Sequence, residues 1–436
     1  MTKNFEDIVS LAKRRGFVYP SSLIYGGLSG FYDFGPLGVE LKFNIKQNWW
    51  KKMVLEKEEV VGISAAIIMN PKTWEASGHL SGFSDFLIEC PNCHHRFRLE
   101  DLGKKKSFFV CPLCFKSFKA EARKFNLMFK TFIGATEDAA SLSYLRPETA
   151  AGIFVNFQNV LKTNRVKIPF GIAQIGKAFR NEINPKNFIF RTREFEQMEL
   201  EYFVKPKEAD FYFKKWVEER FNWYKKLGLK NIRKREQSKK ERAHYSQKTV
   251  DIEYRFPFGF EEIEGIANRG DFDLKSHQKF SRADLNYFDE ETKEKYLPYV
   301  IEPSAGVERI FLALLCEAYE EEKTRKNEKR IVLKLNPQLA PYKAAVFPLL
   351  ANKPKLVELA RLIYQDLKKD FVVFWDERGN IGKRYFSQDE IGTPFCITVD
   401  FESLEKKDVT VRDRDSMKQK RVKIKELKEY LKEKIS

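Results

Sequence analysis

The sequence has no long apolar segment, few cysteines and no internal repeats. No run approaches the roughly 18 uninterrupted apolar residues that a membrane-spanning helix needs, which excludes a membrane protein. Lys13, Arg14 and Arg15 interrupt the only mildly apolar stretch near the N-terminus, which argues against a signal peptide. Six cysteines in 436 residues are too few for a disulfide scaffold. We therefore expect a cytoplasmic protein with reduced thiols.

Length and charge predict several domains and a polyanionic partner. At about 150 residues per domain, 436 residues correspond to roughly three domains. Lysine and arginine number 79 against 62 acidic residues, which gives a net charge of +17. Counterion release then favours nucleic acid as a partner. The alternative is a composition biased toward Lys, Phe, Ile and Asn, as an AT-rich genome would encode.

Hydrophobic periodicity predicts the order of helices and strands. An amphipathic helix opens the chain, and a glycine-rich turn leads to a second helix from about Val39 to Val54. Further helices are expected over 149–161, 210–227 and 306–320, and strands over 170–179 and 193–203. The charged residues 320–329 then lead to a linker around Asn336-Pro337 and Ala340-Pro341. Beyond it, strands over 344–348, 371–375 and 395–400 and helices over 355–369 and 424–434 predict an independent α/β domain.

Four cysteines have the spacing of a structural zinc site. Cys90-Pro-Asn-Cys93 is followed seventeen residues later by Cys111-Pro-Leu-Cys114. Two such turns supply the four tetrahedral sulfur ligands that Zn²⁺ prefers, and a closed ligand shell leaves no place for a catalytic water. The alternatives are four unrelated cysteines or a redox-active pair. Cys316 and Cys396 stand alone on apolar segments and are expected in the core.

One segment almost matches a phosphate-binding loop but lacks a required hydroxyl. Residues 171–178 follow the pattern GxxxxGK[ST] except that Ala178 stands where Ser or Thr would ligate Mg²⁺. The intervening residues also have the character of a strand rather than of a flexible loop. We therefore reject a phosphate-binding loop here.

Two other segments place arginine where a nucleotide could bind. Phe179-Arg180-Asn181-Glu182 ends one strand and a second strand returns, so that Arg180 and Glu182 share one face of a hairpin. Arginine suits a phosphate and a carboxylate suits an exocyclic amine. Arg309 lies in the first turn of a helix that starts at Gly306. A cation is unfavourable at the N-terminus of a helix because of the helix dipole, so an arginine there suggests a bound anionic ligand. Surface salt bridges are the alternative interpretation of both segments.

Together these segments resemble the three motifs of the class II aminoacyl-tRNA synthetases. Pro36 before a long helix resembles motif 1, the hairpin resembles motif 2, and Gly306-Val307-Glu308-Arg309 resembles motif 3. Within the class, the chain is similar to the family of dimeric glycyl-tRNA synthetases over nearly its whole length. The segments that carry this similarity are 24–27 with 32–38, 77–79, 145–150, 191–195 and 300–306.

The resemblance implies an α+β fold and a reaction. A six-to-seven-stranded antiparallel sheet flanked by helices would form a catalytic domain over 1–336, with a zinc-ribbon insertion at 88–124 and a basic helical insertion at 205–250. Residues 337–436 would form a C-terminal α/β anticodon-binding domain, whose basic end from Arg412 to Lys434 suits a phosphate backbone. The implied protein is a homodimeric glycine–tRNA ligase. It would activate glycine with ATP and Mg²⁺ to glycyl-adenylate and transfer the glycyl group to the 3′ end of tRNA-Gly.

The resemblance also implies the site residues. Arg180 and Arg309 would be the catalytic residues, on the α-phosphate and near the γ-phosphate. The ATP site would comprise Arg180, Asn181, Glu182, Phe190, Arg191, Thr192, Arg193, Glu194, Phe195, Glu262, Ile263, Gly306, Val307, Glu308 and Arg309. The glycine site would comprise Arg98, Glu148, Phe195, Glu196, Gln197, Met198, Glu199, Glu302, Pro303, Ser304, Ala305 and Gly306. The structural zinc would be bound by Cys90, Cys93, Cys111 and Cys114.

Three positions depart from the family pattern. Ala151 replaces a glutamine, which could loosen a contact near the adenylate, Glu264 puts a charge where an indole would sit, and Glu308 replaces the commoner aspartate. Another class II synthetase is one alternative, against which Glu148, Glu302 and Ser304 argue. A catalytically inactive nucleic-acid-binding protein on the same scaffold is another, but it need not keep Arg180, Glu182 and Arg309 together.

Overall fold

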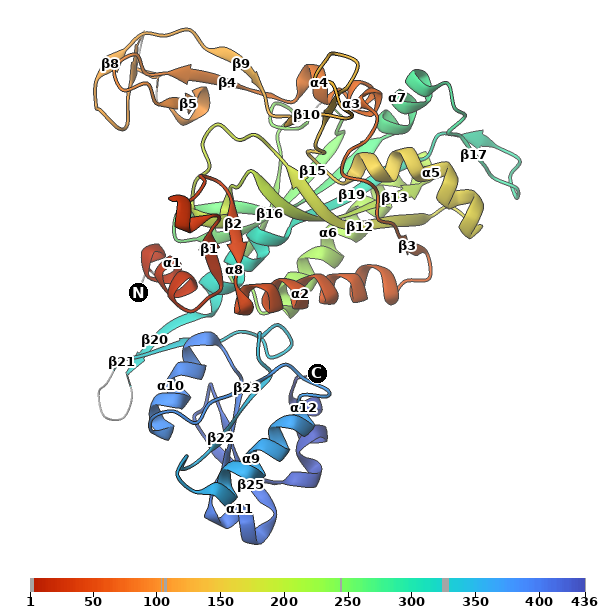
Figure 1. Ribbon diagram of the computed structural model, residues 1–436. Coiled ribbons are helices and arrows are strands. Elements are labelled where there is room, and N and C mark those ends of the chain that lie inside the picture. Colours follow the sequence, from red (N-terminus) through yellow and green to blue (C-terminus); the bar gives the residue numbers. More distant parts are fainter. Residues whose placement is uncertain (1–3, 103, 106–107, 244, 324–328, 436) are drawn as a thin grey trace.

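A seven-stranded sheet forms the centre of the computed structural model, which describes residues 4–102, 104–105, 108–243, 245–323 and 329–435 (Figure 1). The strand order is β14-β15-β16-β19-β13-β12-β3. Neighbouring strands are antiparallel except β3, which runs parallel to β12. The strands are β3 Val60–Gly62, β12 Phe170–Phe179, β13 Glu194–Val204, β14 Ile232–Glu236, β15 Lys248–Phe256, β16 Gly259–Gly270 and β19 Tyr299–Gly306.

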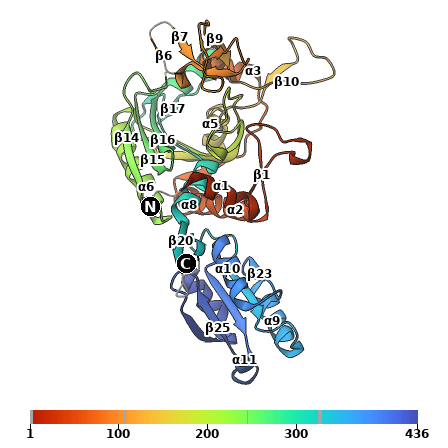
Figure 2. The ribbon, with the colours of Figure 1, turned by 90° about the vertical axis from the view of Figure 1, so that its left-hand side faces the viewer.

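Helices cover one face of this sheet and part of the other (Figure 2). α2 (Pro36–Trp50), α6 (Ala209–Lys226) and α8 (Val307–Ala318) share a core with Met198 and Leu200 of β13. α5 (Ala150–Asn164) and α7 (Phe272–Ser281) pack on the opposite face, where Phe203 of β13 is buried. Because side chains alternate along a strand, the odd-numbered residues of β13 face α5 and the even-numbered ones face α2.

α2 is the long helix expected after the glycine-rich turn. Pro36 occupies its first turn, where its fixed φ and missing N–H are no disadvantage. Leu37, Leu41 and Ile45, at helical spacing, bury one side of it. Gly38 allows close approach to the preceding chain, since a Cβ there would lie 1.9 Å from the carbonyl oxygen of Phe17. The helix starts earlier than the expected Val39 and continues as a π-helical turn over Lys51–Leu55.

The cysteine-bearing segment forms a small module at the opposite end of the molecule from the C-terminal unit (Figures 1 and 2). Its strands make two three-stranded sheets with a shared apolar core around Ile88 and Phe109. The strands are β4 Ser84–Glu89, β5 Arg96–Arg98, β6 Lys104–Lys105, β7 Phe108–Val110, β8 Ser117–Phe118 and β9 Arg123–Asn126.

The basic segment 205–250 is helical only in part, which corrects the expected helical insertion. α6 accounts for its first half, but residues 232–236 form β14, the edge strand of the central sheet. Arg233 and Arg235 of β14 donate to Glu253 on the neighbouring β15, each at 2.6 Å. This cross-strand pairing of opposite charges explains how such a basic sequence joins a sheet.

The C-terminal unit is a five-stranded sheet with helices, ordered β23-β22-β24-β25-β26. Three strands are parallel, and a C-terminal antiparallel hairpin completes the sheet. The expected strand over 344–348 is confirmed as β22, while α10, β25 and β26 were not expected. The bounds are β22 Ala344–Pro348, α9 Pro354–Leu367, β23 Val373–Trp375, α10 Ile381–Ile391, β24 Phe395–Val399, α11 Phe401–Lys406, β25 Asp408–Asp413, β26 Gln419–Lys423 and α12 Leu427–Ile435.

A hairpin rather than a simple charged linker joins the two units. β20 (Tyr319–Lys323) pairs with β21 (Lys329–Leu333) in antiparallel register. Arg330 of β21 is buried, and its Nε donates to Asp389 of α10 at 2.8 Å. The linker was expected farther along the chain, around Asn336-Pro337. The charged residues 320–323 before it form a strand because the acids there pair with basic residues across the hairpin, such as Glu322 with Arg330. Residues 324–328 of that stretch lie outside the described residues.

The remaining short elements surround the central sheet. They are α1 Phe5–Arg14, β1 Val18–Pro20, β2 Tyr32–Phe34, α3 Pro71–Ala76, α4 His79–Gly82, β10 Lys130–Phe132, β11 Leu142–Tyr144, β17 Tyr287–Phe288 and β18 Lys295–Tyr296. Among the described residues, no helix has the length and apolar character to cross a membrane.

Candidate active site

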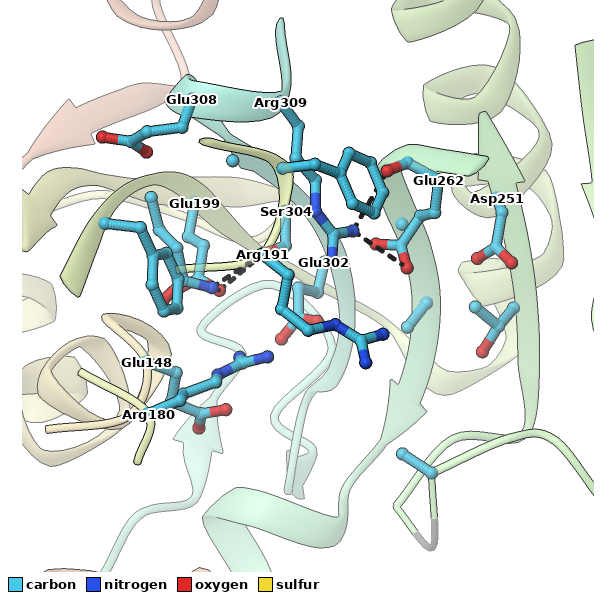
Figure 3. A pocket seen from close by; sticks show the side chains of 18 of the residues that line it. Glu148, Arg180, Arg191, Glu199, Asp251, Glu262, Glu302, Ser304, Glu308 and Arg309 are labelled. Carbon is cyan, nitrogen blue, oxygen red and sulfur yellow. Dashed lines mark hydrogen bonds and ion pairs between the residues drawn. The ribbon is translucent and has the colours of Figure 1, made fainter. Parts of the chain in front are cut away.

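A cavity of about 310 Å³ opens on the α5 side of the central sheet, beside the N-terminus of α8 (Figure 3). It gathers residues that the sequence holds far apart, from the β12–β13 hairpin, from β15, β16 and β19 and from the first turn of α8. The predicted site residues that line it are Glu148, Arg180, Glu182, Phe190, Arg191, Thr192, Phe195, Gln197, Glu199, Glu262, Glu302, Ser304, Gly306, Glu308 and Arg309. The pocket is therefore rich in charge of both signs.

Arg180, directly after β12, is held in place by protein contacts. Its backbone N–H donates to Arg193 O at 2.9 Å, which closes the hairpin, and its Nε donates to Pro147 O at 3.0 Å. The guanidinium lies 5.3 Å from the ring centre of Phe195 and 5.4 Å from that of Phe83. Because Nε is engaged with Pro147, the guanidinium presents its two terminal nitrogens toward the pocket (Figure 3).

Arg309 approaches the same pocket from the start of α8. Its Nη1 donates to Glu262 O at 3.0 Å and lies 3.4 Å from the Glu262 carboxylate. The guanidinium lies 4.6 Å from the ring centre of Phe190. The sequence left two interpretations of Arg309, a salt bridge and a ligand site. Arg309 forms a salt bridge, and it also lines the cavity together with Arg180 and Arg191 (Figure 3).

Glu199 organises the floor of the pocket. Its carboxylate accepts from Ser304 Oγ at 2.6 Å, from Gln197 Nε2 at 2.7 Å and from the Thr149 backbone N–H at 2.8 Å. Burial and the charge of Glu148 raise the pKa of Glu199. Since neighbouring donors occupy the Glu199 oxygens, this residue orients Gln197 and Ser304 toward the cavity.

Glu148 and Glu302 bring two buried carboxyl groups to one end of the pocket. Burial acts to raise the pKa of Glu148, but His79, Arg269 and Arg180 outweigh it and lower this pKa to about 2. Glu302 pairs with Arg269, yet burial, reinforced by Glu199 and Glu148, raises the pKa of Glu302 to about 8. Glu148 Oε1 is buried and finds no hydrogen-bond donor among the described residues. An ammonium group would satisfy it.

Asp251 and Glu262 form a second acidic group at the other side of the pocket. A Cβ on Gly265 would lie 3.7 Å from Glu262 Oε1 and 3.9 Å from Asp251 Oδ1, so both carboxylates border the same space. Burial and the charge of Glu262 raise the pKa of Asp251 to about 6. Carboxylate oxygens are the ligands that Mg²⁺ prefers.

Several predicted site residues do not present their side chains to the pocket. Met198, Ile263, Ala305 and Val307 are buried in the core on the α2 side of the sheet. Glu196, also on that side, pairs with Lys42 and Lys46, and Glu194 pairs with Lys177. Arg193 donates to Glu182 O and Ser29 O and so braces the hairpin. Strand alternation accounts for the β13 residues, because only every second side chain can face a pocket on one side of a sheet. Asn181 and Pro303 also fall outside the lining.

Arg98 lies apart from the pocket. It was expected in the glycine site, but it lies on β5 of the cysteine module and is not among the residues that line the pocket. Its guanidinium is held by Asp85, with Nε 2.8 Å from Oδ2. The Asp85 carboxylate on the adjacent β4 therefore accounts for its position.

The sequence interpretation missed several residues in and around the pocket, including Asp251, Tyr245 and Arg269. Arg269 is buried, pairs bidentately with Asp273 and lies 3.7 Å from the ring centre of Tyr245. Asp251 and Tyr245 line the cavity directly. Arg269 follows Gly265 and Ala267 at alternate positions of one strand, and this alternation is the sequence signal that could have placed it on their face of the sheet.

The four cysteines of the distal module converge. Their Sγ atoms all lie within 4.8 Å of one another, with Cys90–Cys114 at 3.8 Å and Cys93–Cys111 at 3.6 Å. Four sulfurs at a Zn–S distance of about 2.3 Å in a tetrahedron are about 3.8 Å apart. The two turns also repeat each other, since His94 N donates to Cys90 O and Phe115 N donates to Cys111 O, each at 2.9 Å. The geometry fits a closed tetrathiolate site.

Comparisons with known proteins agree with this geometry. Residues 132–319 match the family described as the tRNA synthetase class II core domain (G, H, P, S and T), and residues 343–434 match the anticodon binding domain family. A glycine–tRNA ligase of Borreliella burgdorferi is 55% identical over 99% of this chain and 97% of its own. Those of Alkaliphilus oremlandii and Geobacillus kaustophilus are each 53% identical, over 99% and 100% of both chains, respectively.

The fold, the charged pocket and the two matched domains define a class II aminoacyl-tRNA synthetase. The identity over the full length is specific within that class. The chain belongs to the glycine–tRNA ligase family.

Proposed function

We propose that this protein joins glycine to tRNA-Gly in two steps at the central pocket. The glycine carboxylate attacks the α-phosphorus of ATP, the bond to the bridging oxygen breaks, and pyrophosphate leaves. The terminal ribose hydroxyl of tRNA-Gly then attacks the carbonyl carbon of glycyl-adenylate and AMP leaves. The convergence of Arg180, Arg309 and the carboxylates of Glu148 and Glu302 in one cavity is the observation that carries this proposal.

Arg180 and Arg309 act by electrostatic stabilisation. Negative charge moves onto pyrophosphate as the α-phosphorus changes geometry, and guanidinium groups held in advance stabilise that charge without reorganisation. Arg180 serves the α-phosphate and Arg309 the leaving phosphates, while Phe195 and Phe190 border the adenine. No general base is needed in the first step because the attacking carboxylate is already an anion.

Glycine is recognised by its ammonium group and by the exclusion of anything larger. Glu148 and Glu302 supply charge, and Ser304 and Gln197 supply oriented oxygens. A filled pocket rejects an additional methyl group by steric clash, which is easier than rejecting a missing one. The site therefore needs no editing step against larger amino acids.

Glu262, with Asp251 beside it, would hold the Mg²⁺ that accompanies ATP. Bound there, the ion would neutralise charge on the phosphates. The chain's own contribution is to keep two carboxylates on one side of the pocket, away from Arg180.

The pKa of Glu302 predicts how glycine binding depends on pH. With this pKa raised to about 8, Glu302 is mostly a neutral acid at lower pH and a carboxylate at higher pH. Glycine's ammonium binds the carboxylate, so the KM for glycine should fall by about tenfold between about pH 7 and about pH 8.5. Glycine-dependent ATP–pyrophosphate exchange measures this, with the KM for ATP as the internal control. A KM for glycine that is constant or rises over this range contradicts the assignment.

We also propose that the cysteine cluster binds one structural zinc. After extensive dialysis, one zinc per chain should remain and Cys93→Ser should lose it, because three thiolates leave the shell open. Cys396→Ser is the matched control, since Cys396 is buried in the C-terminal unit away from the cluster. Elemental analysis decides: absence of zinc together with four rapidly titrating thiols in the native protein refutes the site.

The remaining assignments rest on the same function. The C-terminal unit would read the anticodon, and exposed apolar residues of α2, Val39 and Phe43, would contact a second copy in a homodimer acting in the cytoplasm. Arg412 and Arg421 already pair with Asp389 and with Asp400, and Lys428 pairs with Asp370. Lys418 and Lys420 form no ion pair among the described residues and would contact phosphate. Charging of tRNA-Gly transcripts by the purified enzyme, with its molar mass in solution, tests this group of proposals. A monomer, or glycine activation without charging, contradicts it.

A further inference from the structure

A lysine of α2 contacts two segments of the active site from the opposite side of the central sheet. Lys42 is only 8% exposed and lies on the side of the sheet opposite the pocket. Its Nζ is 2.6 Å from Glu308 Oε1 and 2.7 Å from Glu196 Oε2, and it lies 4.0 Å from the ring centre of Phe34. Burial lowers the pKa of Lys42, but Glu308 and Glu196 outweigh it and raise this pKa, so Lys42 is a cation.

The two acids that Lys42 holds are sequence neighbours of nucleotide-site residues. Glu196 follows Phe195 on β13, and Glu308 precedes Arg309 in the first turn of α8. The acids are also joined to each other, because the Glu196 backbone N–H donates to Glu308 Oε2 at 2.9 Å. Lys42 thus links α2 to β13 and α8, close to Phe195 of β13 and Arg309 of α8.

We propose that Lys42 is a positioning residue for ATP binding: by holding Glu196 and Glu308 together, it sets the separation of Phe195 and Arg309. A guanidinium stabilises transferred charge only when it is held close to its productive geometry. Lys46 also pairs with Glu196, but without Lys42 the buried Glu308 loses its cation. The two adjacent carboxylates then repel each other, and β13 and the start of α8 separate. The amino-acid end is less affected, since Glu148 lies on another segment and Glu199 is anchored to that segment by the Thr149 backbone N–H.

The experiment rests on the proposed function, since its readout is glycine-dependent ATP–pyrophosphate exchange by the full-length enzyme. Lys42→Met should raise the KM for ATP by about tenfold or more and leave the KM for glycine within about twofold. Lys42→Arg, which keeps the charge, should recover most of the ATP affinity. A purely structural ion pair would instead lower the active fraction without this selective change in KM.

Lys57→Met is the matched control. Lys57 is similarly buried, pairs with Glu219 at 2.7 Å and lies 4.9 Å from the ring centre of Trp216, but it touches no residue of the pocket. It should leave both KM values unchanged. If Lys42→Met does not fold, Lys42→Gln, which keeps a hydrogen-bond donor, is compared in the same way.

The outcomes separate this inference from the proposed function. No exchange by the unmodified enzyme refutes the function itself. An active enzyme whose folded Lys42 variants bind ATP normally, or lose affinity for glycine and ATP equally, overturns the positioning role. The same holds if Lys57→Met raises the KM for ATP as much as Lys42→Met does.

Discussion

Arg180→Ala should abolish measurable adenylate formation while the protein remains folded. The guanidinium is the group proposed to contact the phosphorus that changes geometry, and Pro147 O and the Phe195 and Phe83 rings already hold it. Removing one such contact raises the barrier by about 3–4 kcal/mol, so kcat for ATP–pyrophosphate exchange should fall by about 10²–10³.

Circular dichroism and the melting transition serve as the folding control for this variant. Arg191→Ala is a useful comparison, because Arg191 lines the same cavity without the stacking contacts of Arg180. Its loss should be smaller. Exchange near the normal rate by folded Arg180→Ala refutes the role given to Arg180.

Arg220→Ala should destabilise the catalytic unit by about 3–5 kcal/mol. Glu264, the charge that stands where the family pattern has an indole, is 1% exposed and accepts two hydrogen bonds from Arg220, at 2.7 and 3.0 Å. The guanidinium also lies 4.2 Å from the ring centre of Trp223. Truncating the arginine leaves an uncompensated buried carboxylate. Urea unfolding followed by tryptophan fluorescence measures the change.

The double variant Arg220→Met with Glu264→Leu separates charge from packing. Replacing both members of a buried pair by apolar residues is often neutral, so the double variant should be more stable than Arg220→Ala alone. If Arg220→Ala unfolds at the same urea concentration as the unmodified protein, the pair does not compensate for the Glu264 departure.

Segments with strong local signals were predicted well from the sequence. The strand over 170–179 is confirmed as β12 with the same bounds, and the helix over 210–227 is confirmed within a residue as α6. Both are rich in apolar residues, and the first five residues of β12 are all buried. The position of Arg180 at the end of β12 follows directly, which is why the hairpin of the pocket was foreseen.

Elements stabilised by partners distant in sequence were not predicted. β14 and β20 are highly charged, and their ion pairs with Glu253 and Arg330 become visible only when the strands are side by side. Arg269 was missed for the same reason, since its buried carboxylate partner Glu302 lies on another strand. Ala151 likewise packs against Trp74 and Met128, a contact that its sequence neighbours do not reveal.

ATP–pyrophosphate exchange with each of the twenty amino acids in turn tests the central claim most directly. Glycine alone should support exchange, because the proposed recognition uses the carboxylates of Glu148 and Glu302 for the ammonium group and excludes larger amino acids. Exchange that depends on a different amino acid, or none with glycine by the folded protein, would contradict the assignment of this pocket to glycine activation.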